Sequence, residues 1–179
     1  MTITFVTTDY TGRVFRCVPH GTKEPLDTSY SLGGGRWNAP DTFQVLYTFL
    51  SVDLARTWAQ QQLANVGATP DNTQPERLPD LVVIDCNLTA IADLTRPAGL
   101  SSVGLPTTYP VGYETQAAWT VTQPIGAALY NQGTPGLLAR SATAKAWDGE
   151  TSSWAELAIF PDHAPPQVLV DRLPYTAWT

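Results

Sequence analysis

The chain has 179 residues, of which 16 are acidic and 10 basic, so its formal net charge is −6. A chain of this length suits one domain that buries roughly 70% of its unfolded surface. The acidic balance argues against a protein that binds nucleic acid by neutralising phosphates. Two cysteines, Cys17 and Cys86, are too few for a disulfide scaffold and too far apart in the sequence for a paired metal motif.

The N-terminal residues lack the basic and long apolar stretches of a signal peptide, and no apolar run approaches the ~20 residues of a membrane span. With only two histidines, His20 and His163, the chain is poorly equipped for a zinc site or a histidine-dependent hydrolytic site. We therefore expect a cytoplasmic protein with no membrane contact and no bound metal.

The first half of the chain predicts two short strands, at residues 3–7 and 14–18, separated by the turn-like residues 9–12. Residues 45–49 are an apolar run typical of a buried strand. Ser51 is the expected N-cap of a helix over residues 52–66, along which apolar residues recur at helical spacing, and Gly67 is the expected stop.

The second half begins with a continuous apolar run at residues 81–86, which predicts a buried strand. Residues 97–112, rich in Gly, Pro, Ser and Thr, are long enough for a functional loop. A second helix is expected at residues 117–130, with Pro124 at its start or at a kink. Strands are expected at 136–142, 154–160 and 168–173. The whole pattern, strand-rich with two main helices, predicts a single α+β domain over residues 1–179.

The most informative stretch reads Gly-Gly-Gly-Arg-Trp-Asn at residues 33–38. Consecutive glycines let a backbone approach a ligand closely, and Arg36 offers a planar fork to an anion. A flexible hairpin with Arg36 in solvent explains the same residues, and the glycines alone slightly favour it. Arg16 lies among apolar residues, where it needs a partner or a cavity unless it faces water. Tyr47 fits a core tyrosine with a bonded hydroxyl, and Ser141 fits an exposed strand position.

In their order along the chain, these residues resemble the RES-domain toxins, the toxic halves of bacterial toxin–antitoxin pairs. The resemblance starts with Phe15-Arg16 and with the Gly-Gly-Arg-Trp-Asn element at residues 34–38. It continues with an apolar strand that carries Tyr47 and is followed by a helix. Further on come a second helix with Gln123 and Gly126, and a strand that ends in Gly-x-Leu-x-x-Ser at residues 136–141.

This resemblance implies a fold similar to ADP-ribosyltransferases and a protein that consumes NAD+, by hydrolysis, phosphorolysis or ADP-ribosyl transfer. It implies that Arg16 and Arg36 hold the NAD+ diphosphate, which suits bidentate guanidinium geometry. Tyr47 would contact the nicotinamide ribose side, and Ser141 would line the same cleft. These four residues form the expected catalytic set. The expected NAD+ contacts are Arg16, Gly35, Arg36, Trp37, Asn38, Tyr47 and Trp58.

One position departs from the family pattern. The family places a glutamate on the helix after the tyrosine strand, where it stabilises the positive charge that develops on the ribose. Trp58 occupies that position here, and residues 25–75 contain no glutamate. Trp58 fits a wall that stacks on a ligand about as well as a core position. Glu114 and Glu156 are distant in sequence and could reach the cleft only through the fold.

The sequence leaves three functions open. The first is an NAD+-consuming toxin, and the second is a RES-fold protein with weak or lost catalysis that acts by binding. The third is an aromatic-rich ligand-binding module, favoured by six tryptophans, seven tyrosines and few charges. Convergence of the four expected catalytic residues on one cleft would argue against the third. The resemblance also implies a cognate antitoxin with a helix-turn-helix domain, and the toxin itself need not touch DNA; a homo-oligomer stays open.

Overall fold

The structure, a computed structural model, describes residues 3–143 and 154–178. Its strands are β1 Thr7–Val18, β2 Leu46–Phe49, β3 Asp80–Leu94, β4 Gly136–Arg140, β5 Ala155–Ile159 and β6 Val168–Pro174. Its α-helices are α1 Val52–Asn65, α2 Pro97–Ser102 and α3 Trp119–Asn131. The predicted α+β class with two main helices, α1 and α3, is confirmed. The short α2 was not predicted, because it lies in the stretch taken for a loop.

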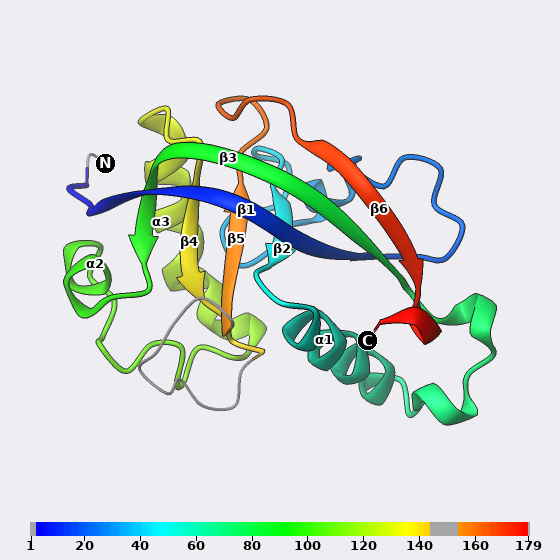
Figure 1. Ribbon diagram of the computed structural model, residues 1–179. Coiled ribbons are helices and arrows are strands. Elements are labelled where there is room, and N and C mark those ends of the chain that lie inside the picture. Colours follow the sequence, from blue (N-terminus) through cyan, green and yellow to red (C-terminus); the bar gives the residue numbers. More distant parts are fainter. Residues whose placement is uncertain (1–2, 144–153, 179) are drawn as a thin grey trace.

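The strands form one sheet in the order β1-β2-β5-β4-β3-β6, and β1 pairs with β3 as well. This additional pairing connects the first and fifth strands of the order, so five strands close on themselves and β6 extends the sheet from β3. Only β3 and β4 are parallel, and the other pairs are antiparallel. Figure 1 shows β1 and β3 side by side as the two longest strands.

The prediction of two separate N-terminal strands is wrong, because residues 7–18 form the single strand β1. The turn-like residues lie inside it and are accommodated by a register shift against β3 between Thr8 and Tyr10. On the facing strand Ala90 has a φ of 55°, and its N–H donates to the Asp9 carboxylate at 2.9 Å. Polar residues that looked like loop signals therefore form an irregularity within a long pair of strands.

Helix α1 begins and ends as the sequence predicts. The Ser51 hydroxyl accepts a hydrogen bond from the Leu54 N–H at 3.2 Å, which caps the helix start. Gly67, two residues after the helix, has a φ of 73°, a conformation that favours glycine. Helix α3 contains Pro124 in its interior rather than at its start. Within residues 3–143 and 154–178, no helix combines the length and hydrophobicity needed to cross a membrane.

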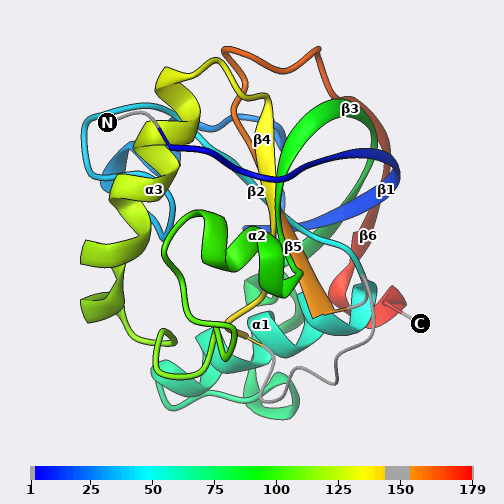
Figure 2. The same cartoon turned by 90° about the vertical axis from the view of Figure 1, so that its left-hand side faces the viewer.

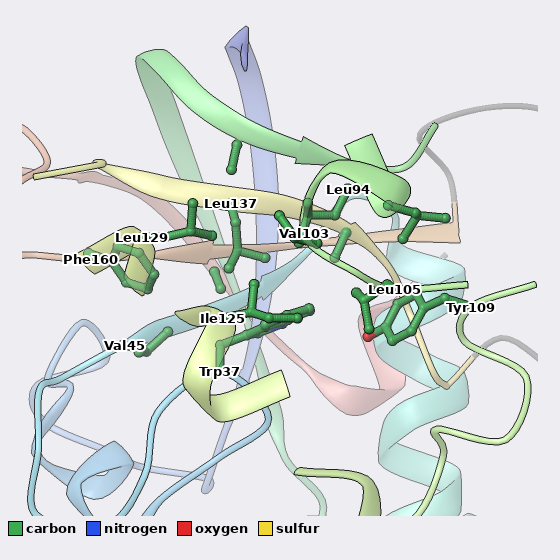
Figure 3. Packing of buried hydrophobic residues seen from close by; sticks show 14 of the residues in the cluster. Trp37, Val45, Leu94, Val103, Leu105, Tyr109, Ile125, Leu129, Leu137 and Phe160 are labelled. Carbon is green, nitrogen blue, oxygen red and sulfur yellow. The ribbon is translucent and has the colours of Figure 1, made fainter. Parts of the chain in front are cut away.

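The largest buried cluster lies between α3 and the strands, with Trp37 and Ile125 next to each other (Figure 3). A Cβ at Gly126 of α3 would overlap the backbone carbonyl of Trp37, so this glycine lets the helix lie directly on the loop. A separate cluster joins α1 to the C-terminal residues, where Trp178 packs with Leu54. In the view of Figure 2, α3 runs along one flank while α1 lies at a different end of the sheet. The two helices thus hold the loop at residues 33–38 and the strand β2 from separate directions.

Candidate functional site

A cavity of about 610 Å³ lies between β1, β2, β5, α1 and the loop that precedes β2. This volume is within the range of about 300–1,000 Å³ typical of small-molecule sites. Five of the residues expected to contact NAD+ line it, namely Arg16, Gly35, Arg36, Tyr47 and Trp58. They come from four separate parts of the fold, so their convergence is a product of the tertiary structure.

Arg16 lies on the buried face of β1, where buried and half-buried residues alternate from Val14 to Val18. Its guanidinium donates to the backbone carbonyls of Pro25 and Asp27, each at 2.7 Å, and its carbon Cζ lies 4.6 Å from the centre of the Tyr30 ring. A guanidinium has five N–H donors, and two of them have these partners. Because the residue is only 7% exposed, its charge is fixed at the cavity wall and weakly screened by water.

The glycine loop is shaped by its contact with Tyr47. A Cβ at Gly35 would lie 2.5 Å from the Tyr47 hydroxyl oxygen, so only glycine fits in this conformation. The Tyr47 hydroxyl donates to Asn38 Oδ1 at 2.8 Å and accepts from the Trp37 N–H at 2.9 Å. Burial raises the pKa of Tyr47 well above its ordinary value, so the hydroxyl remains protonated at neutral pH.

Arg36 follows the glycines and is held at the cavity wall by two partners. Its Nη1 donates to the Tyr113 carbonyl at 2.7 Å, and its Nε lies 3.6 Å from Glu156 Oε1. Burial alone would lower the pKa of Arg36, but the negative charge of Glu156 and the nearby Tyr109 more than offset this, so the pKa lies above its usual value. Arg36 is therefore a permanent cation that keeps N–H donors beyond these two partners.

Glu156 is the residue that the sequence prediction left out of the site. It lies on β5, opposite Phe49 of β2 and Ala139 of β4, and it lines the cavity. Its Oε1 accepts a hydrogen bond from Trp37 Nε1 at 3.1 Å. Burial raises the pKa of its carboxyl above the usual range, and Arg36, Trp37 and Ser141 offset this only in part. An acid inside an apolar strand was the available signal, since a buried carboxylate needs partners.

Two comparisons with known proteins match this chain, one with a family model and one with a solved structure. The family model of the RES domain matches residues 13–178. The chain belongs to the RES domain family. A solved structure, the crystal structure of the M. tuberculosis MbcT–MbcA toxin–antitoxin complex, contains a similar fold with a TM-score of 0.75. The two chains are 20% identical, and the match covers 93% of this chain and 85% of the other. No curated protein matches the sequence.

Three residues of this RES domain that were expected to contact the ligand do not line the cavity: Trp37, Asn38 and Ser141. All three are fully buried. Trp37 bonds to Glu156, and the Asn38 amide donates to the Ser31 carbonyl at 2.6 Å. The structure thus places these three side chains outside the cavity lining, and their contact with NAD+ stays a prediction.

Ser141 directly follows the end of β4, close to Glu156. Its hydroxyl bonds to the Glu156 carboxylate and accepts from the Thr143 N–H at 3.2 Å. Of the four expected catalytic residues, Arg16, Arg36 and Tyr47 line the cavity of this RES domain, and Ser141 does not border it.

The sequence left two interpretations of Trp58, a cavity wall and a core position, and its surroundings have features of both. It lines the cavity, and its ring also packs against Phe49 with ring centres 5.8 Å apart. Cys17 lines the cavity beside it, and burial raises the pKa of the Cys17 thiol to about 12. That thiol is therefore uncharged at neutral pH and a poor nucleophile. Among the residues that the structure describes, no three His, Cys, Asp or Glu side chains are grouped to hold a metal ion.

Proposed function

We propose that this RES domain is the toxin of a toxin–antitoxin pair and that it cleaves the bond between nicotinamide and ribose in NAD+. Its membership of the RES family and the fold it shares with a chain of the MbcT–MbcA complex support the toxin assignment. The observation that carries the NAD+ assignment is one cavity that combines a buried arginine, Arg16, and a half-buried arginine, Arg36, with a buried carboxylate.

The arginines match the diphosphate of NAD+ in charge and geometry. Arg16 and Arg36 each keep N–H donors after their described protein partners are counted, and a guanidinium can give two parallel hydrogen bonds to phosphate oxygens. Their burial makes the attraction stronger than at a surface. Aromatic side chains, Trp58 and Trp119, supply apolar wall for the adenine or nicotinamide rings.

Cleavage requires the bond between the ribose carbon and the nicotinamide nitrogen to break. The bonding electrons go to the nitrogen, which becomes neutral, and the ribose carbon becomes positively charged. An oxygen or other nucleophile of water, inorganic phosphate or a protein then bonds to that carbon and its proton passes to solvent. The products distinguish these acceptors: ADP-ribose, its phosphorylated form, or a modified protein.

An antitoxin would inhibit this reaction by covering the cavity entrance. The entrance includes exposed residues such as Glu24 and Tyr30, which a partner can reach without unfolding the domain. We expect the partner to carry a helix-turn-helix domain, as the family resemblance implies, and to contact DNA in place of this acidic chain. Co-expression should then restore the growth that this protein alone stops.

A second function remains a candidate because Trp58 replaces the family glutamate: a RES domain that binds NAD+ and cleaves it weakly or not at all. The third, a general aromatic ligand-binding module, is disfavoured by the convergence of three expected catalytic residues on one cavity. Nicotinamide release separates the first two functions, since both predict NAD+ binding.

The test is to incubate the purified protein with NAD+ and to quantify nicotinamide by chromatography. Arg36→Ala should abolish detectable release and weaken NAD+ binding by about 10–100-fold, the loss of one charge-assisted contact. Arg13→Ala is the matched control, because Arg13 lies on the exposed face of β1 and pairs with Asp85 at 3.5 Å. A wild-type protein that neither binds NAD+ nor releases nicotinamide would refute the proposal.

A further inference from the structure

We propose that Glu156 is the catalytic carboxylate of this cavity, the group that faces the nicotinamide ribose and stabilises its positive charge as the bond to nicotinamide breaks. This inference rests on the proposed NAD+ cleavage and assigns a residue on β5 to a role that the sequence pattern places on α1. Five observations carry it: burial, placement, free acceptor capacity, charge and the position of Trp58.

The first observation is that Glu156 is the buried acid of the cavity wall. The other described carboxylates that line it, Glu24 and Asp27, are exposed at the entrance. The Asp27 carboxylate is also bound by the N–H and hydroxyl of Ser29, at 2.9 and 2.6 Å. A carboxylate in water stabilises a nearby cation several-fold less than one in a protein interior. Glu156, with a side chain 12% exposed, is therefore the acid able to act on a bound ribose.

The second observation is that three neighbours fix the Glu156 carboxylate in place. Trp37 Nε1 and Arg36 Nε approach its Oε1 at 3.1 and 3.6 Å, and the Ser141 hydroxyl bonds to the carboxylate as well. The backbone is held by β2 on one side and β4 on the other. A charge fixed before the substrate binds stabilises a transition state without a cost of reorganisation.

The third observation is that the carboxylate keeps capacity for a ligand. Its two oxygens offer about four acceptor sites, and the described hydrogen bonds, from Trp37 Nε1 and the Ser141 hydroxyl, account for two of them. The remaining sites belong to a side chain that borders the cavity, where a ribose hydroxyl can donate to it.

The fourth observation concerns the charge of the groups around Glu156. Arg36 faces it from the glycine loop, Tyr47 from β2 and Tyr109 from the residues between α2 and α3. The pKa of each of these three groups is raised, so both tyrosines stay neutral and Arg36 stays positive around neutral pH. Titration of Glu156 itself therefore controls the charge of this wall.

The fifth observation is that Trp58 and Glu156 line the same cavity. The position on α1 where the family pattern places a glutamate is thus occupied by an aromatic wall, and an acid from β5 borders the same space. The cavity retains a carboxylate although α1 supplies none. In the proposed step Glu156 forms no bond: the electron pair leaves with nicotinamide, and the acceptor loses its proton to solvent.

The experiment compares Glu156→Gln and Glu156→Asp with a matched control, Glu114→Gln. Glu114 is an exposed acid outside the cavity wall. For each protein, the NAD+ dissociation constant is measured by calorimetry and the kcat of nicotinamide release is measured from pH 5 to pH 9. Glu156→Gln should lower kcat about 100-fold, the scale of one preorganised charge-stabilising group, with the dissociation constant changed by less than about threefold. Glu156→Asp should retain part of the rate, and Glu114→Gln should match wild type.

The pH profile separates catalysis from a structural role. Wild-type kcat should rise with pH through one ionisation above the ordinary range of a glutamate, and the residual rate of Glu156→Gln should be flat. A Glu156→Gln protein as fast as wild type would overturn the inference, as would a Trp58→Glu protein at least tenfold faster than wild type. If Glu156→Gln fails to fold, a flat wild-type profile overturns it. Wild type that binds NAD+ without cleaving it refutes Glu156 catalysis alone, and wild type that does not bind NAD+ refutes the proposed function as well.

Discussion

Tyr47→Phe tests how the structure holds the glycine loop against the cavity. The substitution removes one oxygen and leaves the ring, so the packing of β2 is nearly unchanged. That oxygen donates to Asn38 and accepts from the Trp37 N–H, and both partners are fully buried. Without the hydroxyl, the Trp37 N–H and the Asn38 carbonyl oxygen lose this hydrogen bond.

The expected loss follows from these two contacts. Two ordinary hydrogen bonds contribute about 1 kcal/mol each, and a buried unpaired group adds a desolvation cost of about 1–3 kcal/mol. Because Tyr47 borders the cavity, water can reach the vacated position and reduce that cost. We therefore expect the free energy of unfolding to fall by about 2 kcal/mol, the contribution of the two hydrogen bonds without the added desolvation cost. For a domain of this size, that lowers Tm by about 4–8 °C.

The assay is equilibrium denaturation of wild type and variant by urea, with tryptophan fluorescence as the signal. Tyr175→Phe is the matched control, because the Tyr175 hydroxyl is exposed and its contact with the Gln60 amide is 3.4 Å long. Its free energy of unfolding should stay within about 0.5 kcal/mol of wild type. If Tyr47→Phe is as stable as Tyr175→Phe, the Tyr47 hydroxyl does not hold the loop and the reasoning is wrong.

Three further predictions follow from single contacts. Gly35→Ala places a Cβ 2.5 Å from the Tyr47 hydroxyl and should cost about 1–3 kcal/mol of unfolding free energy, whereas Gly33→Ala enters open space and should be neutral. Asp80 is buried and bonded to His20 and Arg172, which together with the Gly21 N–H hold its pKa low despite burial. The ionised Asp80 stabilises the fold above pH ~4, and this stabilisation is lost as pH falls through the lowered pKa. Asp80→Asn should therefore lower the free energy of unfolding by about 2 kcal/mol at pH 7, and denaturation in acid should show the difference from wild type becoming smaller. For Glu156 the free energy of unfolding changes with pH in the opposite direction, because its pKa is raised. Wild type should lose stability relative to Glu156→Gln as pH rises above ~4, and equal slopes of stability against pH for the two proteins would contradict this.

Local signals in the sequence predicted most of the elements. A cap at Ser51 and a glycine stop at Gly67 define α1 because both act within one helical turn. The strands β2, β4, β5 and β6 each begin and end within two residues of their apolar runs. The errors came from polar residues inside long strands, since β1 and β3 tolerate turn-like residues only because each strand stabilises the other along its length.

The site was predictable only as far as its residues are adjacent in sequence or match the family pattern. Trp37, the neighbour of Arg36, and Tyr47 meet through a short loop, so their proximity follows from the chain itself. Glu156 reaches the same cavity because β5 pairs with β2, a contact 109 residues apart in the sequence at Thr48 and Leu157. No local pattern encodes that pairing. Ser141 was expected at the cavity but does not border it; it directly follows β4, which pairs with β5 so that Ala139 lies opposite Glu156.

The most direct test of the account is a proton NMR time course of NAD+ mixed with a catalytic amount of the purified protein. The account predicts that free nicotinamide accumulates beyond one equivalent of protein and that Arg36→Ala stops its appearance. The same spectra identify the ribose product and so the acceptor. If NAD+ remains intact and its signals are unchanged by the protein, the cavity does not take NAD+ and the account is contradicted.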